Sequence, residues 1–159
     1  MKPGLEKLFR EYSESHKHPT NRLTHKIAIP MIVFHILAML DWVKLFQLPG
    51  LAHPISLAYV AYAIAMAWYL WQDVKLGTLV GLGFAACIPL GWYVPAYGVV
   101  AIAVVGWLVQ LAGHVVWEKK QPSFFTNLVH ALVGPVFFVA VLVGEWRLEE
   151  QPQVSTRPA

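Results

Sequence analysis

The sequence predicts an all-α membrane protein: a polytopic helical bundle of about five membrane-embedded helices that follow an N-terminal amphipathic segment. Two observations carry this prediction. Of the 159 residues, 57% are hydrophobic and only 13% are charged, whereas a soluble domain has about 45–50% apolar and about 25% charged residues. Charge is also almost missing between residues 27 and 117, where only Asp41, Lys44, Asp73 and Lys75 are charged. The length suits one integral membrane domain over residues 1–148, with a polar C-terminal tail at 149–159.

The first 26 residues are too polar to span a membrane. Their apolar side chains include Leu5, Leu8, Phe9 and Tyr12, a spacing that suits a short amphipathic helix lying on the membrane surface. Five apolar stretches follow, each near the roughly 20 residues that a helical span needs: 27–40 with a weak continuation to 46, then 52–71, 76–93, 96–117 and 127–143.

Charge pairs and helix breakers separate these stretches. Asp41 with Lys44 marks one loop and Asp73 with Lys75 marks another, while prolines and a glycine punctuate the joins near residues 49, 50 and 95. The stretch 76–93 holds several glycines and a proline, which is typical of a short, kinked or re-entrant segment.

Basic residues predict the orientation in the membrane, because cytoplasmic loops carry an excess of lysine and arginine. Six basic residues lie within the first 26. With the N-terminus inside and five spans, Lys75, Lys119 and Lys120 also fall inside. We therefore expect a multi-pass protein whose active site is at the cytoplasmic face. The basic charge flanks the spans, which argues against nucleic acid as a partner, and the lone Cys87 excludes an internal disulfide.

Seven histidines is a high number for such a chain, and on this topology five of them gather on the cytoplasmic side: His16, His18, His25, His114 and His130. Spacing sharpens the pattern, because residues four apart share a helix face. Gln110, His114 and Glu118 form one polar row, and Asn21 shares a face with His25. Ionisable groups in a span are costly and usually face the bundle interior, and imidazole suits iron, zinc, copper or nickel.

Simpler interpretations stay open for several of these residues. Glu118 could merely pair with Lys119 or Lys120 at the membrane interface. His35 lies in mid-span and is more simply a structural hydrogen-bonding group, and His53 falls on the opposite side as an interfacial anchor. His18 and His130 could serve either role.

Two segments resemble motifs of the Mpo1-like family. His16, Asn21, His25 and Pro30 match the pattern H-x-x-x-x-N-x-x-x-H-x-x-x-x-P. The segment from Gln110 to Pro122 matches the pattern Q-x-x-G-H-x-x-x-E-x-x-x-P through Gln110, Gly113, His114, Glu118 and Pro122. Asn127-Leu128 and Gly134-Pro135 resemble the segment that follows. The double motif is specific, whereas either half alone would be weak.

This resemblance implies an iron(II)-dependent dioxygenase of fatty-acid α-oxidation, which acts on 2-hydroxy fatty acids and shortens them by one carbon. The partners would be the 2-hydroxy acid, O2 and membrane lipid, and the cofactor Fe(2+). The motif histidines His16, His25 and His114 would bind the metal, and we add His130 as a further candidate ligand. Glu118, Asn21 and Gln110 are the catalytic candidates, and Arg22, Lys119 and Lys120 are candidates to hold the substrate carboxylate.

Two other classes of function stay open at this point. One is a haem-binding membrane electron carrier, which needs two histidines at similar depth, with His35 as the deep candidate. The other is a non-enzymatic transporter or scaffold whose histidines sense pH. The sequence leaves the oligomeric state open.

Overall fold

The computed structural model describes residues 1–119 and 129–147. Helices make up 78% of the described residues, which confirms the all-α class. The elements in chain order are α1 (Pro3–Glu14), α2 (Pro19–Asp41), β1 (Lys44–Phe46), β2 (Ile55–Ser56), α3 (Leu57–Gln72), α4 (Val74–Trp92), α5 (Ala96–Ala112), the π-helix η1 (Gly113–Glu118) and α6 (Val129–Leu142).

Local sequence signals explain where the long helices begin. Pro19 occupies the first position of α2, where its missing N–H costs nothing. His18 precedes it as the N-cap, and its Nδ1 accepts the backbone N–H of Thr20 at 3.2 Å. At the start of α4, the Asp73 carboxylate accepts the backbone N–H of Leu76 at 2.9 Å. Both caps therefore satisfy backbone donors that a helix start leaves free.

Three helical segments are long and apolar enough to cross a membrane: α2 with 23 residues, α4 with 19, and α5 continued by η1 with 23. The other two expected spans contain α3, with 16 residues, and α6, with 14. At 1.5 Å per residue these reach about 24 and about 21 Å, short of the roughly 30 Å hydrocarbon core. The expectation of five spanning helices is thus not confirmed for these two.

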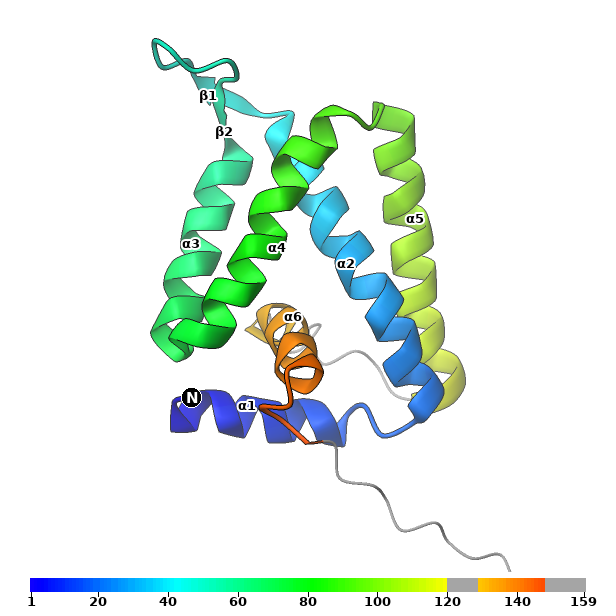
Figure 1. The fold of residues 1–159 in the computed structure, drawn as a ribbon. Coiled ribbons are helices and arrows are strands. Elements are labelled where there is room, and N and C mark those ends of the chain that lie inside the picture. Colours follow the sequence, from blue (N-terminus) through cyan, green and yellow to red (C-terminus); the bar gives the residue numbers. More distant parts are fainter. Residues whose placement is uncertain (120–128, 148–159) are drawn as a thin grey trace, which may run out of the picture.

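The helices form two pairs that enclose a space between them. In Figure 1, α2 lies beside α5 and α3 lies beside α4, and the pairs approach each other at the end near the strands. Gly91 of α4 closely approaches Ala38 of α2 there: a Cβ on Gly91 would lie 3.1 Å from the Ala38 methyl group. The pairs diverge toward α1, and α6 is seen nearly end-on between them.

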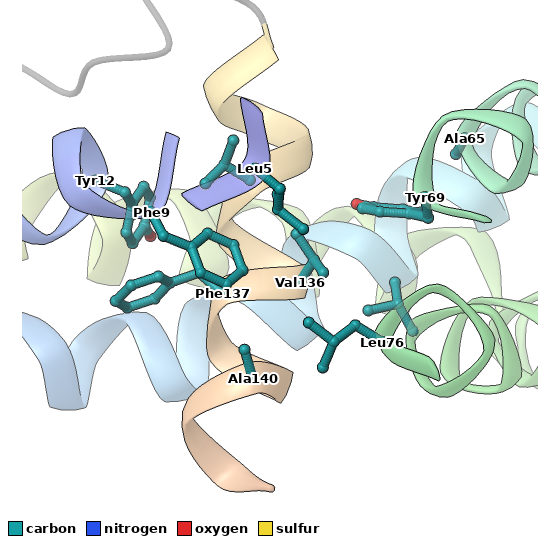
Figure 2. Packing of buried hydrophobic residues seen from close by; sticks show 11 residues of the cluster. Leu5, Phe9, Tyr12, Ala65, Tyr69, Leu76, Val136, Phe137 and Ala140 are labelled. Carbon is teal, nitrogen blue, oxygen red and sulfur yellow. The ribbon is translucent and has the colours of Figure 1, made fainter. Parts of the chain in front are cut away.

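Helix α1 is amphipathic, as expected, and its apolar side is covered by α6. Leu5, Phe9 and Tyr12 are buried, and Figure 2 shows them facing Val136 and Phe137. The rings of Phe9 and Phe137 pack edge to face with centroids 5.2 Å apart. This packing holds the N-terminal helix against the open end of the bundle.

The all-α prediction included no strands, and the short antiparallel pair β1 and β2 corrects it on this point. Asp41, at the end of α2, is buried and pairs with Lys44 at 2.7 Å. The same carboxylate accepts the Ser56 hydroxyl at 2.5 Å and the Trp92 indole N–H at 3.1 Å. An expected loop charge therefore anchors the hairpin to the bundle, through partners that are distant in the sequence.

Candidate metal centre

Three buried histidines from three different segments converge at the wide end of the bundle. His16 lies between α1 and α2, His25 lies in α2, and His114 lies in η1. The Nε2 atom of His25 is 3.1 Å from that of His16 and 3.0 Å from that of His114. One ligand nitrogen from each ring lies within 4.8 Å of the other two. The structure thus brings together the three histidines that the two sequence motifs single out.

Backbone carbonyls fix which nitrogen of two of these rings carries hydrogen. His16 Nδ1 lies 2.7 Å from the Tyr12 carbonyl oxygen, and His25 Nδ1 lies 2.8 Å from that of Asn21. A carbonyl can only accept, so each Nδ1 must donate. Burial, reinforced by the neighbouring His25, holds the pKa of His16 well below its ordinary value, so this ring is neutral. Neutral rings with hydrogen on Nδ1 present the lone pairs of Nε2 to the centre of the group.

Converging lone pairs repel one another unless a proton or a cation lies between them. The Gln110 amide nitrogen donates to His25 Nε2 at 2.7 Å. This hydrogen bond satisfies the lone pair of His25 but not those of the other two histidines. Gln110 Oε1 and His114 Nδ1 are buried without a hydrogen-bond partner in the described part of the chain. Such unpartnered atoms are costly in a core. Three imidazole nitrogens that converge in this way fit a divalent transition metal.

Gly113, the first residue of η1, lets this π-helix approach α2 closely and so helps to position His114. A Cβ atom on Gly113 would collide with Asn21 Oδ1 and Thr24 Oγ1 of α2. Glycine removes this obstacle, and the next residue along, His114, then reaches His25. Single π-helical turns are rare and are frequent at functional sites.

Glu118 connects the far end of η1 to the start of α2. Its Oε1 accepts the backbone N–H of His18 at 2.7 Å and the side-chain amide of Asn21 at 3.2 Å. The carboxylate therefore lies at the positive end of the α2 dipole. Asn21 is fully buried and contacts the centre through its backbone, because its carbonyl orients His25. Glu118 and Asn21 are therefore linked to the three-nitrogen group through hydrogen bonds to its neighbours, and neither side chain belongs to that group.

Arg22 and Lys119, two of the candidates for binding the substrate carboxylate, differ in their surroundings. Arg22 lines a small cleft beside His16 and His25, and its Nε donates to the His16 carbonyl oxygen at 2.8 Å. Lys119 is exposed and ends η1 in a left-handed conformation with φ 52°. Lys120 lies outside the described residues. Lys26, which the sequence analysis missed, lines the same cleft, and its position four residues after Arg22 was the available signal.

The remaining histidines lie outside the three-nitrogen group. His130, the further ligand candidate, is on α6, and its Nε2 lies 3.5 Å from a carboxylate oxygen of Glu11.

His35 donates to the Met31 carbonyl oxygen at 3.0 Å and accepts the Trp107 indole N–H at 3.3 Å. The hydrogen bonds of His35 agree with the simpler structural interpretation. His53 stacks on Trp92 at a centroid distance of 3.7 Å, near the strands.

An apolar cavity of about 260 Å³ opens from the histidines into the space between the helix pairs. Its polar lining at the histidine end includes His16, Gln110 and His114. Its apolar lining comes mainly from α2, α3, α4 and α6: Ile29, Ile32, Val33, Ile36, Leu37, Leu40, Ala61, Ala65, Phe84, Ala131, Leu132 and Pro135. A long hydrocarbon chain with a polar head group fits a cavity of this kind.

Comparisons with known proteins identify the family of this chain. The family model described as 2-hydroxy-palmitic acid dioxygenase Mpo1-like matches residues 4–146. The chain is also 30% identical over 128 residues to the 2-hydroxy-palmitic acid dioxygenase MPO1 of Saccharomyces cerevisiae, an alignment that covers 80% of this chain and 72% of the yeast protein. No solved structure gives a significant match. Since the family model spans both histidine motifs and nearly the whole described chain, this protein belongs to the Mpo1-like family.

Proposed function

We propose that this chain is a membrane-embedded iron(II)-dependent dioxygenase that converts a long-chain 2-hydroxy fatty acid to the fatty acid one carbon shorter. The observation that carries the proposal is the meeting of three imidazole nitrogens at the mouth of an apolar cavity. The name of the yeast relative, a 2-hydroxy-palmitic acid dioxygenase, supports the same class of substrate and reaction.

His16, His25 and His114 would hold the iron. When bound, iron(II) supplies the one-electron chemistry through which dioxygen reacts with an organic acid. One 2-hydroxy acid and one O2 give the shortened acid, carbon dioxide and water, and this balance needs no other reductant.

The chain's own residues bind and orient the acid. Arg22 uses Nε to donate to the His16 carbonyl. Its terminal nitrogens, which have no hydrogen-bond partner among residues 1–119 and 129–147, would donate to the substrate carboxylate. Lys26 adds positive charge to the same cleft. The acyl chain would then extend the other way, into the apolar cavity. The head group is thereby held next to His16 and His25, while the cavity walls exclude water from it.

Glu118 and Asn21 would position the histidines rather than contact the acid. The Asn21 carbonyl fixes the His25 ring, and Glu118 holds both Asn21 and the N-terminus of α2. Such outer hydrogen-bonding partners keep a ligand's orientation and basicity.

The structure gives less support to the haem hypothesis. His35, its deep ligand candidate, uses both ring nitrogens in hydrogen bonds to Met31 and Trp107. The three converging histidines present their nitrogens to one point, whereas axial haem ligands must face each other across a macrocycle.

The first test is metal analysis of the full chain, purified anaerobically in detergent. We expect iron in equimolar amount, and its loss from the variants His16→Ala, His25→Ala and His114→Ala. His53→Ala is the matched control. This histidine lies at the opposite end of the bundle, so its replacement should leave the metal content unchanged.

The second test is mass spectrometry of products from 2-hydroxypalmitate under air and under argon. Equal product in both gases, or turnover that persists with an iron chelator, would refute the dioxygenase and favour a transporter or scaffold.

A further inference from the structure

The apolar cavity extends from the histidines toward the end of the bundle that carries the strands. Along α2 its lining begins at Ile29, one turn beyond His25, and continues to Leu40. The eleven steps from Ile29 to Leu40, at 1.5 Å each, give this wall a length of about 16 Å. On the opposite side the lining continues along α3 from Tyr69 to Ala61. Because α3 runs away from the strands, Ala61 lies at the same end as Leu40.

Packed side chains border the cavity at this end. Leu37, Ala58 and Ile88 are at most 4% exposed and form a separate apolar cluster, with Leu40 and Phe84 packed against it. A hydrocarbon chain that enters from the histidines therefore meets Leu40 and Ala61 last along the lining, next to this packed cluster.

The length of this cavity corresponds to a definite number of carbon atoms. A saturated chain advances about 1.25 Å per bond, as follows from a C–C bond of about 1.52 Å and an angle near 111°. A wall of about 16 Å thus accommodates about 13 bonds beyond the head group. We propose that Leu40 and Ala61 form an end stop that sets the longest acyl chain the protein accepts. This proposal rests on the proposed function, because it takes the cavity as the place of the acyl chain of a 2-hydroxy acid.

Selection by this end stop is steric rather than hydrophobic. The acid arrives from a bilayer whose interior is as apolar as the cavity, so additional methylene groups gain little by entering the protein. A chain that is too long must instead press into the packed cluster behind Leu40. Overpacking of this kind costs about 1–3 kcal/mol. For an acid that is too long, kcat/KM should therefore be about 5- to 150-fold lower than for an acid that fits.

Two substitutions should move the limit in opposite directions. Ala61→Phe fills about one helical turn of the cavity, 5.4 Å, and should shorten the longest accepted chain by about four bonds. Leu40→Ala removes the opposing side of the stop and should admit longer chains. Ala63→Phe is the matched control, since Ala63 lies on the same helix but is exposed and does not line the cavity.

The experiment uses the full chain in detergent and an equimolar mixture of 2-hydroxy acids of graded chain length. Turnover in air is measured by mass spectrometry, and the acids retained under argon are measured separately. We expect Ala61→Phe to shift both profiles to shorter chains, Leu40→Ala to shift both to longer chains, and Ala63→Phe to match the wild type.

The outcomes separate the two proposals. If the wild type turns over the series and the profiles of Ala61→Phe and Ala63→Phe are the same, the end stop is refuted while the dioxygenase stands. If nothing is turned over but the retained acids shift as expected, the reaction is refuted while the end stop stands. If Ala61→Phe does not fold, Leu40→Ala decides, and an unchanged upper limit in that variant overturns the proposal.

Discussion

Replacing Gly113 with alanine should disturb the histidine group without altering any of its ligands. The added methyl group would collide with Asn21 Oδ1 and Thr24 Oγ1 of α2, and Asn21 cannot retreat freely because it is fully buried and bonded to Glu118. Overpacking costs about 1–3 kcal/mol, and the better helix propensity of alanine offsets up to about 1 kcal/mol. We expect the free energy of unfolding to fall by about 1–2 kcal/mol.

The same collision should weaken metal binding, because η1 must move away from α2 and carry His114 with it. Metal–nitrogen distances tolerate only about ±0.2 Å, and disturbed outer partners cost about 10- to 100-fold in affinity. Thermal unfolding in detergent and iron retention against a chelator measure the two effects. Gly83→Ala is the control, since a Cβ on Gly83 of α4 meets nothing within 4 Å, and it should be neutral or slightly stabilising. Equal stability and equal iron retention in the two variants would refute the close approach of η1 to α2.

Three further predictions concern charges near the site. The metal-free protein should lose stability as the pH falls below about 6.5, because the unfolded chain then binds a proton that buried His16, with its lowered pKa, does not bind. Thermal unfolding between about pH 8 and about pH 5 measures this loss. His16→Gln should flatten the dependence of stability on pH. Glu118→Gln should keep the metal but lower the affinity for it by about 10- to 100-fold in a chelator competition. Complete loss of the metal, as expected for His114→Ala, would instead make Glu118 a ligand. Arg22→Ala should raise KM for the 2-hydroxy acid with little change in kcat if Arg22 holds the carboxylate throughout the reaction, and an unchanged KM in steady-state assays would contradict this role.

The sequence predicted the histidine convergence because two simple rules apply there. Helical spacing placed Gln110, His114 and Glu118 on one face, and the alternation of spans brought that row to the same side as His25. Both rules depend only on local periodicity and on the order of apolar segments. The convergence holds even though residues 113–118 form a π-helix and only three segments are long enough to span a membrane.

Other features depend on contacts between distant residues and were therefore missed. The hairpin is too short to show an alternating pattern, and it is held by Asp41 through Ser56 and Trp92. The need for glycine at position 113 reflects the side chains of Asn21 and Thr24 on another helix. The role of Tyr12, whose carbonyl orients His16 and whose ring stacks on it at 3.9 Å, appears only when α1 is docked.

The three histidines are separated very unequally along the chain, and this has a consequence for biosynthesis. His16 and His25 are nine residues apart, whereas His114 follows His25 by 89 residues. During translation, the first two leave the ribosome almost together, but the third is added only after α3, α4 and α5 have been made. A nascent chain can thus offer a metal at most two of its three imidazoles until the α5 segment has emerged and docked against α2. We therefore expect loading of the proposed iron to be a late step, after most of the helices have been assembled.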